Sequence, residues 1–543
     1  MTMTNCQHAL DEFLDDVRHQ DLVKAKIVMG CFNRLASMEQ RRILYELNKC
    51  ADDFALPLLV LLVVHDQKNA DDYPALLEAI LARAINRPDI IIKELRRSSP
   101  EQYYHIRLCG QLRLEQAVEP LAAVLTTATN TSILQETINA LGLIGNHQAA
   151  KAVTEYLYSD HKDLISAAIE ALGRIATPTA MFYLAERLGK DEETDMLILD
   201  IFAAVQDDIS LHKLNDTLRA RSAHLRNYSK QKLVSIGAKS LAVVTANLAI
   251  PDDDLQIHSL NILQDIGDET SVISLRQLLN SCPRNANVRF AAYEALARLP
   301  GLKGDYVLAA GLTDPDANVR MAATRAIDGN FDAVLAAGIK NMVKKQDGES
   351  VRIIKAVVDS QSEHIFLSLL DVDFFRAIIL DYLAVKVHPE TREFYLHLLR
   401  KENHNELAGK IVSRSVQEVD IGQMAKICAV DDSRMILNVY RSVLTELGYD
   451  PVLFSNPETA LNWLKEEKPL LVCTDLNMPQ LTGIELIRQL RQWYGKDELP
   501  ILMVTTQNDQ RDSNEAYAAG ANAIMNKPFD ADKMRLMIND VIS

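Results

Sequence analysis

Side chains that bind metal ions and phosphoryl groups recur in the last part of the sequence, each at the end of an apolar run. They are Asp431 and Asp432, Asp475, Thr505 and Lys527. Three carboxylates held together repel one another, and few-carboxylate sites with open water positions suit Mg²⁺. Lys527 adds a positive charge opposite Asp475, and an ion pair about 4 Å apart at an effective dielectric constant of about 20 contributes about 4 kcal/mol before desolvation. Metal, ammonium and hydroxyl together have the charge to neutralise a phosphoryl group that arrives at a carboxylate.

The apolar runs before these residues predict the elements that hold them. From about Met424, short strands alternate with helices, which predicts parallel βαβ units. Strands are expected at residues 426–430, 451–454, 470–474, 501–505 and 523–525, and helices at 433–447, from 457, from 483, at 512–519 and at 530–541. This order predicts an α/β, flavodoxin-like (βα)5 domain whose site lies at the carboxyl ends of the strands.

Residues 426–543 resemble the receiver domains of two-component response regulators. The matching motifs are Val430-Asp431-Asp432-Ser433, Asp475-Leu476-Asn477-Met478-Pro479 followed by Gly483, Val504-Thr505, Ala519-Gly520-Ala521 and Lys527-Pro528-Phe529. The resemblance implies that Asp475 accepts a phosphoryl group from a histidine kinase or phosphotransfer protein. It implies Mg²⁺ as cofactor, and the implied ligands are Asp431, Asp432, Asp475 and the backbone carbonyl of Asn477. Thr505 and Lys527 are implied to bind the phosphoryl oxygens and to act in the switch.

Taken one at a time, the same residues have purely structural explanations. The pair Asp431-Asp432 suits a helix N-cap, Asp475 suits a turn, and Lys527 suits a solvated surface charge. The required residue types at several strand ends together favour the functional interpretation. Ile524 departs from the family pattern at the switch position, because receivers usually place an aromatic residue three positions before the lysine. Thr506 is a second departure, since a small residue is common there.

A repeated phrase precedes this domain. Asn287-Val288-Arg289 returns as Asn318-Val319-Arg320 after 31 residues, and Ser350-Val351-Arg352 follows after a further 32. The glycines at 110, 142 and 173 keep the same period and are interpreted as turns. A period of this length predicts stacked pairs of short helices.

The phrase from Asp314 to Ala323 resembles the HEAT-repeat family, including bacterial relatives similar to the phycobilin-lyase type. Asp314-Pro315 separates two helices, and Val319 and Ala323 are expected to pack inward. Arginines at the phrase position are either ligand-binding groups or a ladder that pairs with turn carboxylates. The rule that charges at repeat positions support the scaffold favours the ladder.

The repeat signal is strong over residues 100–360 and weak before residue 100, and helical spacing continues to residue 412. Roughly ten to twelve units would fill this length. We therefore expect an all-α HEAT-like solenoid over residues 1–415, a polar linker at 416–423 and a receiver domain at 424–543.

Composition limits the kinds of partner. The 543 residues are 48% hydrophobic and carry a formal net charge of −16, which argues against non-specific binding to nucleic acid or anionic membranes. The longest apolar run, 55–64, has about half of the ~20 residues needed to span a bilayer, so no membrane insertion is expected. The first residues lack a signal-peptide pattern, and the seven cysteines show no zinc spacing. These features predict a soluble protein in a reducing cytoplasm.

Two kinds of function fit this architecture. The first is a bacterial signalling adaptor, a phosphoprotein in which phosphorylation of Asp475 controls how the repeat platform binds the receiver or an unidentified protein partner. No helix-turn-helix, Walker loop or HExxH motif occurs in the sequence. The alternative is a lyase-like enzyme on the repeats that the receiver regulates, but no activated nucleophile, acid pair or metal cluster is visible there. The sequence favours the adaptor, with no enzyme activity beyond the receiver's own phosphoryl transfer and dephosphorylation.

Overall fold

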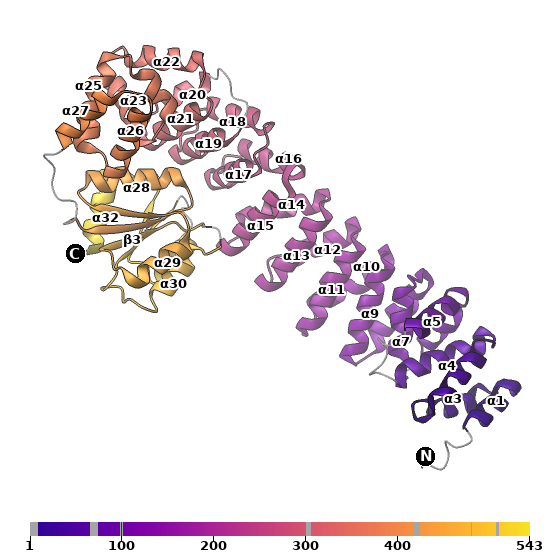
Figure 1. Ribbon diagram of the computed structural model, residues 1–543. Coiled ribbons are helices and arrows are strands. Elements are labelled where there is room, and N and C mark those ends of the chain that lie inside the picture. Colours follow the sequence, from indigo (N-terminus) through magenta and orange to yellow (C-terminus); the bar gives the residue numbers. More distant parts are fainter. Residues whose placement is uncertain are drawn as a thin grey trace. The chain divides into compact units, whose positions relative to one another are not determined.

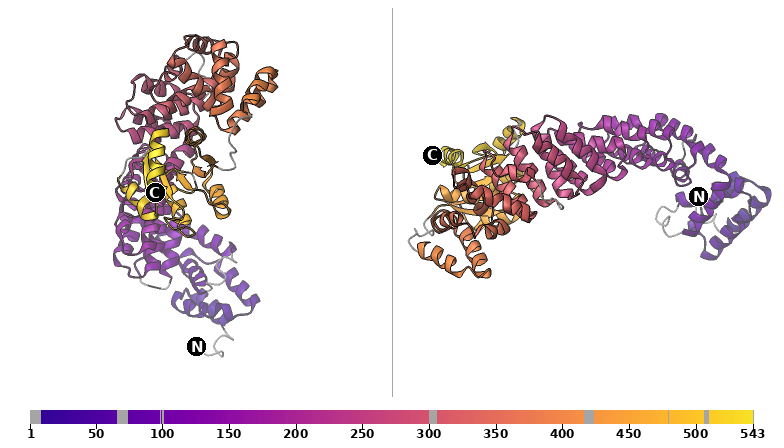
Figure 2. Two further views of the ribbon diagram at one scale, coloured as in Figure 1. Left: turned by 90° about the vertical axis from the view of Figure 1, so that its left-hand side faces the viewer. Right: turned by 90° about the horizontal axis from the view of Figure 1, so that it is seen from above.

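A computed structural model of the chain describes residues 9–65, 74–97, 99, 101–299, 306–415, 424–478, 480–505 and 510–542. The chain forms two compact units, Met1–Lys213 and Leu214–Ser543. The boundary between them lies inside the predicted repeat domain. Within each unit, successive helix pairs stack in sequence order (Figures 1 and 2). The predicted linker, 416–423, and the departure at Thr506 lie outside the described residues.

The first unit contains helices only among its described residues. They are α1 Ala9–His19, α2 Leu22–Met29, α3 Ser37–Leu47, α4 Asp52–His65, α5 Pro74–Asn86, α6 Pro88–Glu94, α7 Gln102–Gln111, α8 Val118–Thr127, α9 Thr131–Ile144, α10 His147–Val153, α11 Lys162–Ile175, α12 Pro178–Arg187, α13 Glu192–Val205 and α14 Asp208–Asp216, which crosses the unit boundary. Helices α7, α9 and α11 pack side by side.

The periodic glycines do not form turns, as the sequence suggested, but lie inside α7, α9 and α11. A Cβ added to Gly110 would lie 2.7 Å from Cα of Ala140, and one added to Gly142 would lie 2.8 Å from Cα of Ala171. The glycines therefore allow backbones of successive helices to touch, and their period reports helix contact rather than chain reversal.

The second unit continues the helical array. Its helices are α15 Ala223–Ile236, α16 Leu241–Ala246, α17 Asp253–Ile266, α18 Ser271–Asn280, α19 Ala286–Arg298, α20 Tyr306–Gly311, α21 Ala317–Gly329, α22 Ala333–Val343, α23 Gly348–Asp359, α24 Glu363–Leu369, α25 Asp373–Asp381, α26 Pro389–Lys401 and α27 Asn405–Ser415. Side-chain caps begin many of them, as at Asp252, Asn285 and Asp316, whose oxygens accept bonds from the first free backbone amides.

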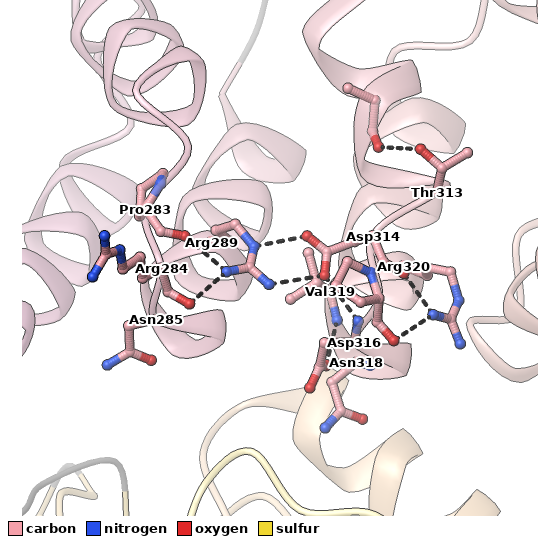
Figure 3. A network of polar contacts seen from close by, with 12 residues as sticks. Pro283, Arg284, Asn285, Arg289, Thr313, Asp314, Asp316, Asn318, Val319 and Arg320 are labelled. Carbon is pink, nitrogen blue, oxygen red and sulfur yellow. Dashed lines mark hydrogen bonds and ion pairs between the residues drawn. The ribbon is translucent and has the colours of Figure 1, made fainter.

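The arginines of the repeated phrase belong to the scaffold, as Figure 3 shows for Arg289 and Arg320. Arg289 pairs with Asp314 of the next turn at 2.7 Å and donates to two carbonyls of its own turn. Arg320 donates to the carbonyls of Asp314 and Pro315 instead of a carboxylate, while Arg352 pairs with Glu349 of its own helix. The predicted pairing with turn carboxylates is therefore seen at Arg289, and the other two arginines use different acceptors.

One helical stretch among the described residues, Ala223–Ala249, is long and apolar enough to cross a membrane by length and composition. Gly237, with φ of 68°, interrupts it between α15 and α16. Both pieces pack against α17, so the stretch is accounted for as one repeat pair of the array.

The C-terminal part forms a five-stranded parallel sheet in the order β2-β1-β3-β4-β5. The strands are β1 Lys426–Val430, β2 Asp450–Phe454, β3 Leu471–Thr474, β4 Ile501–Thr505 and β5 Ala523–Asn526. The helices are α28 Arg434–Glu446, α29 Pro457–Glu466, α30 Gly483–Leu490, α31 Gln510–Ala519 and α32 Ala531–Ile542. One core joins α29, α30 and α31 to the sheet, and α28 packs with α32. The expected fold class, an all-α array followed by a (βα)5 domain, is confirmed.

Candidate functional site

The carboxyl ends of three strands bring an ammonium group between two carboxylates. Asp431 follows β1, Asp475 follows β3 and Lys527 follows β5. Nζ of Lys527 lies 2.6 Å from Oδ2 of Asp431 and 2.8 Å from Oδ1 of Asp475. All three residues are buried. The structure brings these three residues together at one edge of the sheet, as the sequence predicted.

Backbone bonds fix this edge. The amide of Asp475 donates to the carbonyl of Val430 at 3.0 Å, so the residue after β3 lies beside the end of β1. The amide of Asn477 donates to Oδ2 of Asp475 at 2.8 Å, which orients the carboxylate. The amide of Lys527 donates to the carbonyl of Thr505 at 2.8 Å. Each functional side chain therefore starts from backbone tied to a neighbouring strand.

Burial and mutual repulsion raise the pKa of the acids. Burial, followed by the charges of Asp475 and Asp432, raises the pKa of Asp431 to about 8, although Lys527 opposes the shift. Burial and the charge of Asp475 raise the pKa of Asp432 to about 6. Burial alone would lower the pKa of Lys527, but the two carboxylates outweigh it and raise it. The edge is thus an acidic pocket in which one ammonium provides the central positive charge.

The side chains here have the chemistry of a Mg²⁺ site. Asp432, Asp475 and Asn477 line a cavity of about 150 Å³. Oδ1 of Asn477 is buried and has no hydrogen-bond partner within the described part of the chain. In that part, no group of three or more His, Cys, Asp or Glu side chains is arranged to hold a metal ion, and Lys527 takes the position between Asp431 and Asp475. The donors are the oxygen ligands that Mg²⁺ prefers, so the residues fit the ion.

We expect Mg²⁺ to bind more tightly as pH rises from about 6 to about 8, because protons compete with the metal for carboxylates whose pKa is raised. Asp431, with a pKa of about 8, and Asp432, with a pKa of about 6, both lose protons over this range. Isothermal titration calorimetry in buffers of different ionisation enthalpy measures the dissociation constant and the protons released. An affinity that does not change with pH contradicts this prediction.

The two remaining predicted positions lie on β4 and β5. Thr505 ends β4, is buried, and pairs in register with Asn526. Ile524 is half-buried and packs against the apolar core that α29, α30 and α31 share. The position where the family usually has an aromatic ring is therefore filled by an aliphatic core contact.

The sequence did not reveal that repeat residues form the other wall of the cavity. Lys230, His258, Asn287, Glu294 and Asn318 line it together with the acidic edge. Asn287 and Asn318 were visible as members of the repeated phrase, but no local signal marks a repeat position that contacts another domain.

Comparisons with known proteins match the helical repeats and the C-terminal domain to two different families. A family model for HEAT repeats matches residues 88–173, 118–197 and 241–328. The model for the response regulator receiver domain matches 427–539. The chemotaxis protein CheY homolog of Campylobacter jejuni is 32% identical over 120 residues, which are 22% of this chain and 92% of that protein. The chain belongs to the response-regulator receiver family.

Other relatives match through the receiver as well. The alkaline phosphatase synthesis transcriptional regulatory protein PhoP of Bacillus subtilis is 35% identical over 117 residues, 22% of this chain and 48% of that protein. The solved structure of the chemotaxis response regulator CheY4 of Vibrio cholerae has 30% identity, covers 22% of this chain and 99% of that chain, and has a TM-score of 0.21. Both resemblances inferred from sequence motifs, to receivers and to HEAT repeats, are confirmed.

Proposed function

We propose that the chain is a cytoplasmic two-component response regulator in which a histidine kinase or phosphotransfer protein phosphorylates Asp475, and that this controls protein binding by the HEAT array. The observation that carries the proposal is the buried carboxylate of Asp475, held by Lys527 next to Asp431. The proposal includes a HEAT-repeat domain at 1–415, a linker at 416–423 and a receiver domain at 424–543.

The chemistry follows from the contacts. An oxygen of Asp475 forms a bond to phosphorus while the bond from phosphorus to the donor breaks. The leaving atom is the histidine nitrogen of a kinase or phosphotransfer protein, or the acetate oxygen of acetyl phosphate. Lys527 then binds a phosphoryl oxygen with the ammonium that now bridges Asp431 and Asp475, and Thr505 donates its hydroxyl to another. Asp431, Asp432, Asp475 and the backbone carbonyl of Asn477 would hold Mg²⁺, which when bound would supply positive charge to neutralise the incoming group. The lyase-like alternative gains no supporting observation from the described repeats.

Incubation with acetyl phosphate and Mg²⁺ is expected to add one phosphoryl group to the wild-type chain and none to Asp475→Asn. The amide nitrogen and oxygen of asparagine cannot replace the carboxylate as nucleophile. Intact-protein mass spectrometry or phosphate-affinity electrophoresis measures the product. Asp497→Asn, at an exposed position of the receiver, is the matched control and keeps wild-type labelling. Undiminished labelling of Asp475→Asn refutes the assignment.

A further inference from the structure

Two asparagines at equivalent repeat positions bind the receiver next to its phosphorylation site. Nδ2 of Asn287 donates to the carbonyl of Lys527, and Nδ2 of Asn318 donates to the carbonyl of Phe529 at 3.1 Å. Each is the second residue of its helix, α19 or α21. The caps of these helices come from Asn285 and Asp316, so the scaffold leaves both amide groups to the receiver.

The third copy of the phrase shows the contrast. At the equivalent position it has Ser350, whose hydroxyl lies 2.9 Å from the carbonyl oxygen of Met342 in α22 and 2.9 Å from Oδ1 of its N-cap Asp347. A repeat thus folds with a different residue at this position. The repeat fold therefore does not require asparagine at this position.

Arg226 provides a third contact. It donates to the carbonyls of Ala220 and Arg221, six and five residues back, as Arg289 does to the carbonyls of Pro283 and Arg284. Its Nη2 pairs with Oδ2 of Asp512 in α31 at 2.6 Å, with both side chains nearly fully buried. The ladder arginine of this repeat therefore takes its acidic partner from the receiver.

These contacts cover the phosphorylation site. The hydroxyl of Ser433 donates to Glu294 of α19 at 2.7 Å, and α28 packs against α21 and α23. The cavity beside Asp475 is walled on the repeat side by Asn287 and Glu294 of α19 and by Asn318 of α21. A phosphodonor must bring its reacting atoms within about 3–3.5 Å of the nucleophile. Asp475 is buried, and these repeat side chains lie beside the space through which a donor would approach it.

We propose that the docking surface formed by Arg226, Asn287, Glu294 and Asn318 binds the chain's own receiver and keeps Asp475 closed to phosphodonors until the receiver detaches. This inference rests on the proposed phosphorylation of Asp475. Lys527 links the two events, because its carbonyl is bound by Asn287 while its ammonium holds Asp431 and Asp475. Binding free energies at linked sites are reciprocal, so weaker docking raises the fraction of receivers open to phosphorylation.

The test compares labelling rates of full-length variants with acetyl phosphate and Mg²⁺. Asn287→Ala/Asn318→Ala removes both amide contacts and is expected to be phosphorylated roughly fivefold faster or more. Asp512→Asn weakens docking from the receiver side and is expected to act in the same direction. The matched control, Asn280→Ala/Asn341→Ala, makes the same chemical change at two exposed repeat positions and keeps the wild-type rate.

Hydrogen exchange gives a second readout. Both docking variants are expected to exchange faster than wild type over residues 510–533, where α31 and the loop after β5 meet the repeats. Unchanged or slower labelling together with unchanged exchange in both variants overturns the docking proposal, while labelling that still requires Asp475 leaves the phosphorylation proposal intact. Labelling that persists in Asp475→Asn overturns the phosphorylation proposal instead.

Discussion

Lys527→Met is expected to destabilise the receiver domain by about 3–5 kcal/mol at about pH 8, because removing one partner of a buried ion pair leaves the other charge uncompensated. Here two carboxylates lose their partner, since the ammonium lies 2.6 Å from Asp431 and 2.8 Å from Asp475. Methionine keeps nearly the length and the apolar stem of lysine. The change in stability therefore reports the removal of the positive charge rather than a loss of packing.

The loss of stability caused by Lys527→Met is expected to become smaller as pH falls toward about 5. Asp431 already has a pKa raised to about 8 with lysine present, and without the ammonium its pKa rises further. A carboxyl whose pKa is raised in the folded state favours folding at low pH, and this contribution is lost as pH rises through the folded pKa. The difference between variant and wild type therefore grows with pH.

Urea unfolding followed by tryptophan fluorescence measures this change in the full chain. The chain's two tryptophans, Trp463 and Trp493, both lie in the receiver domain, so their signal reports that domain alone. Lys533→Met, an exposed lysine of α32, is the matched control and is expected to change stability by less than about 0.5 kcal/mol. Equal urea midpoints for Lys527→Met and wild type at about pH 8 contradict the prediction.

Gly483→Ala is expected to reduce phosphorylation of Asp475 about a hundredfold, because a misplacement of about 1 Å at a reacting group has an effect of this order. A Cβ at this position would lie 2.0 Å from the backbone oxygen of Asp475 and 3.2 Å from Cα of Leu476. Since the contact is with backbone, the loop that carries Asp475 must move. Alanine favours helix over glycine, so only the clash accounts for a loss.

Initial rates of labelling with acetyl phosphate and Mg²⁺ measure the effect of Gly483→Ala. Gly495→Ala is the matched control within the receiver, because a Cβ there meets its nearest atom, Oε2 of Glu498, at 3.5 Å, an ordinary contact. Unfolding by urea is expected to show a loss of about 1–3 kcal/mol for Gly483→Ala. A labelling rate equal to that of Gly495→Ala shows that the loop accepts the side chain without moving the carboxylate.

The site was readable from the sequence because of the parallel sheet. Each short apolar run ends at a polar residue, and parallel strands place their carboxyl ends at one edge, so Asp431, Asp475 and Lys527 had to meet once the topology was inferred. The ammonium's position between the two carboxylates did not follow, since spacing along the chain does not fix where a long flexible side chain settles.

The sequence period predicted the repeat array, but it did not predict the role of the periodic glycines or the contact partners of the repeats. Gly110 and Gly142 suggested turns, because glycine marks both chain reversals and close helix contacts. Only the neighbouring helix, which approaches at Ala140 or Ala171, distinguishes the two uses. The partner of Asn287 was equally hidden, because a contact 240 residues away leaves no trace in local spacing.

The separation in sequence between the docking surface and its occupant has a consequence for synthesis. The three contacts join residues 211, 240 and 286 positions apart. On a ribosome that adds roughly 5–20 residues per second, the helices that carry Asn287 and Asn318 emerge roughly ten seconds to a minute before the loop they bind. During that interval the docking surface of a nascent chain is without its own receiver, because that domain has not yet been synthesised.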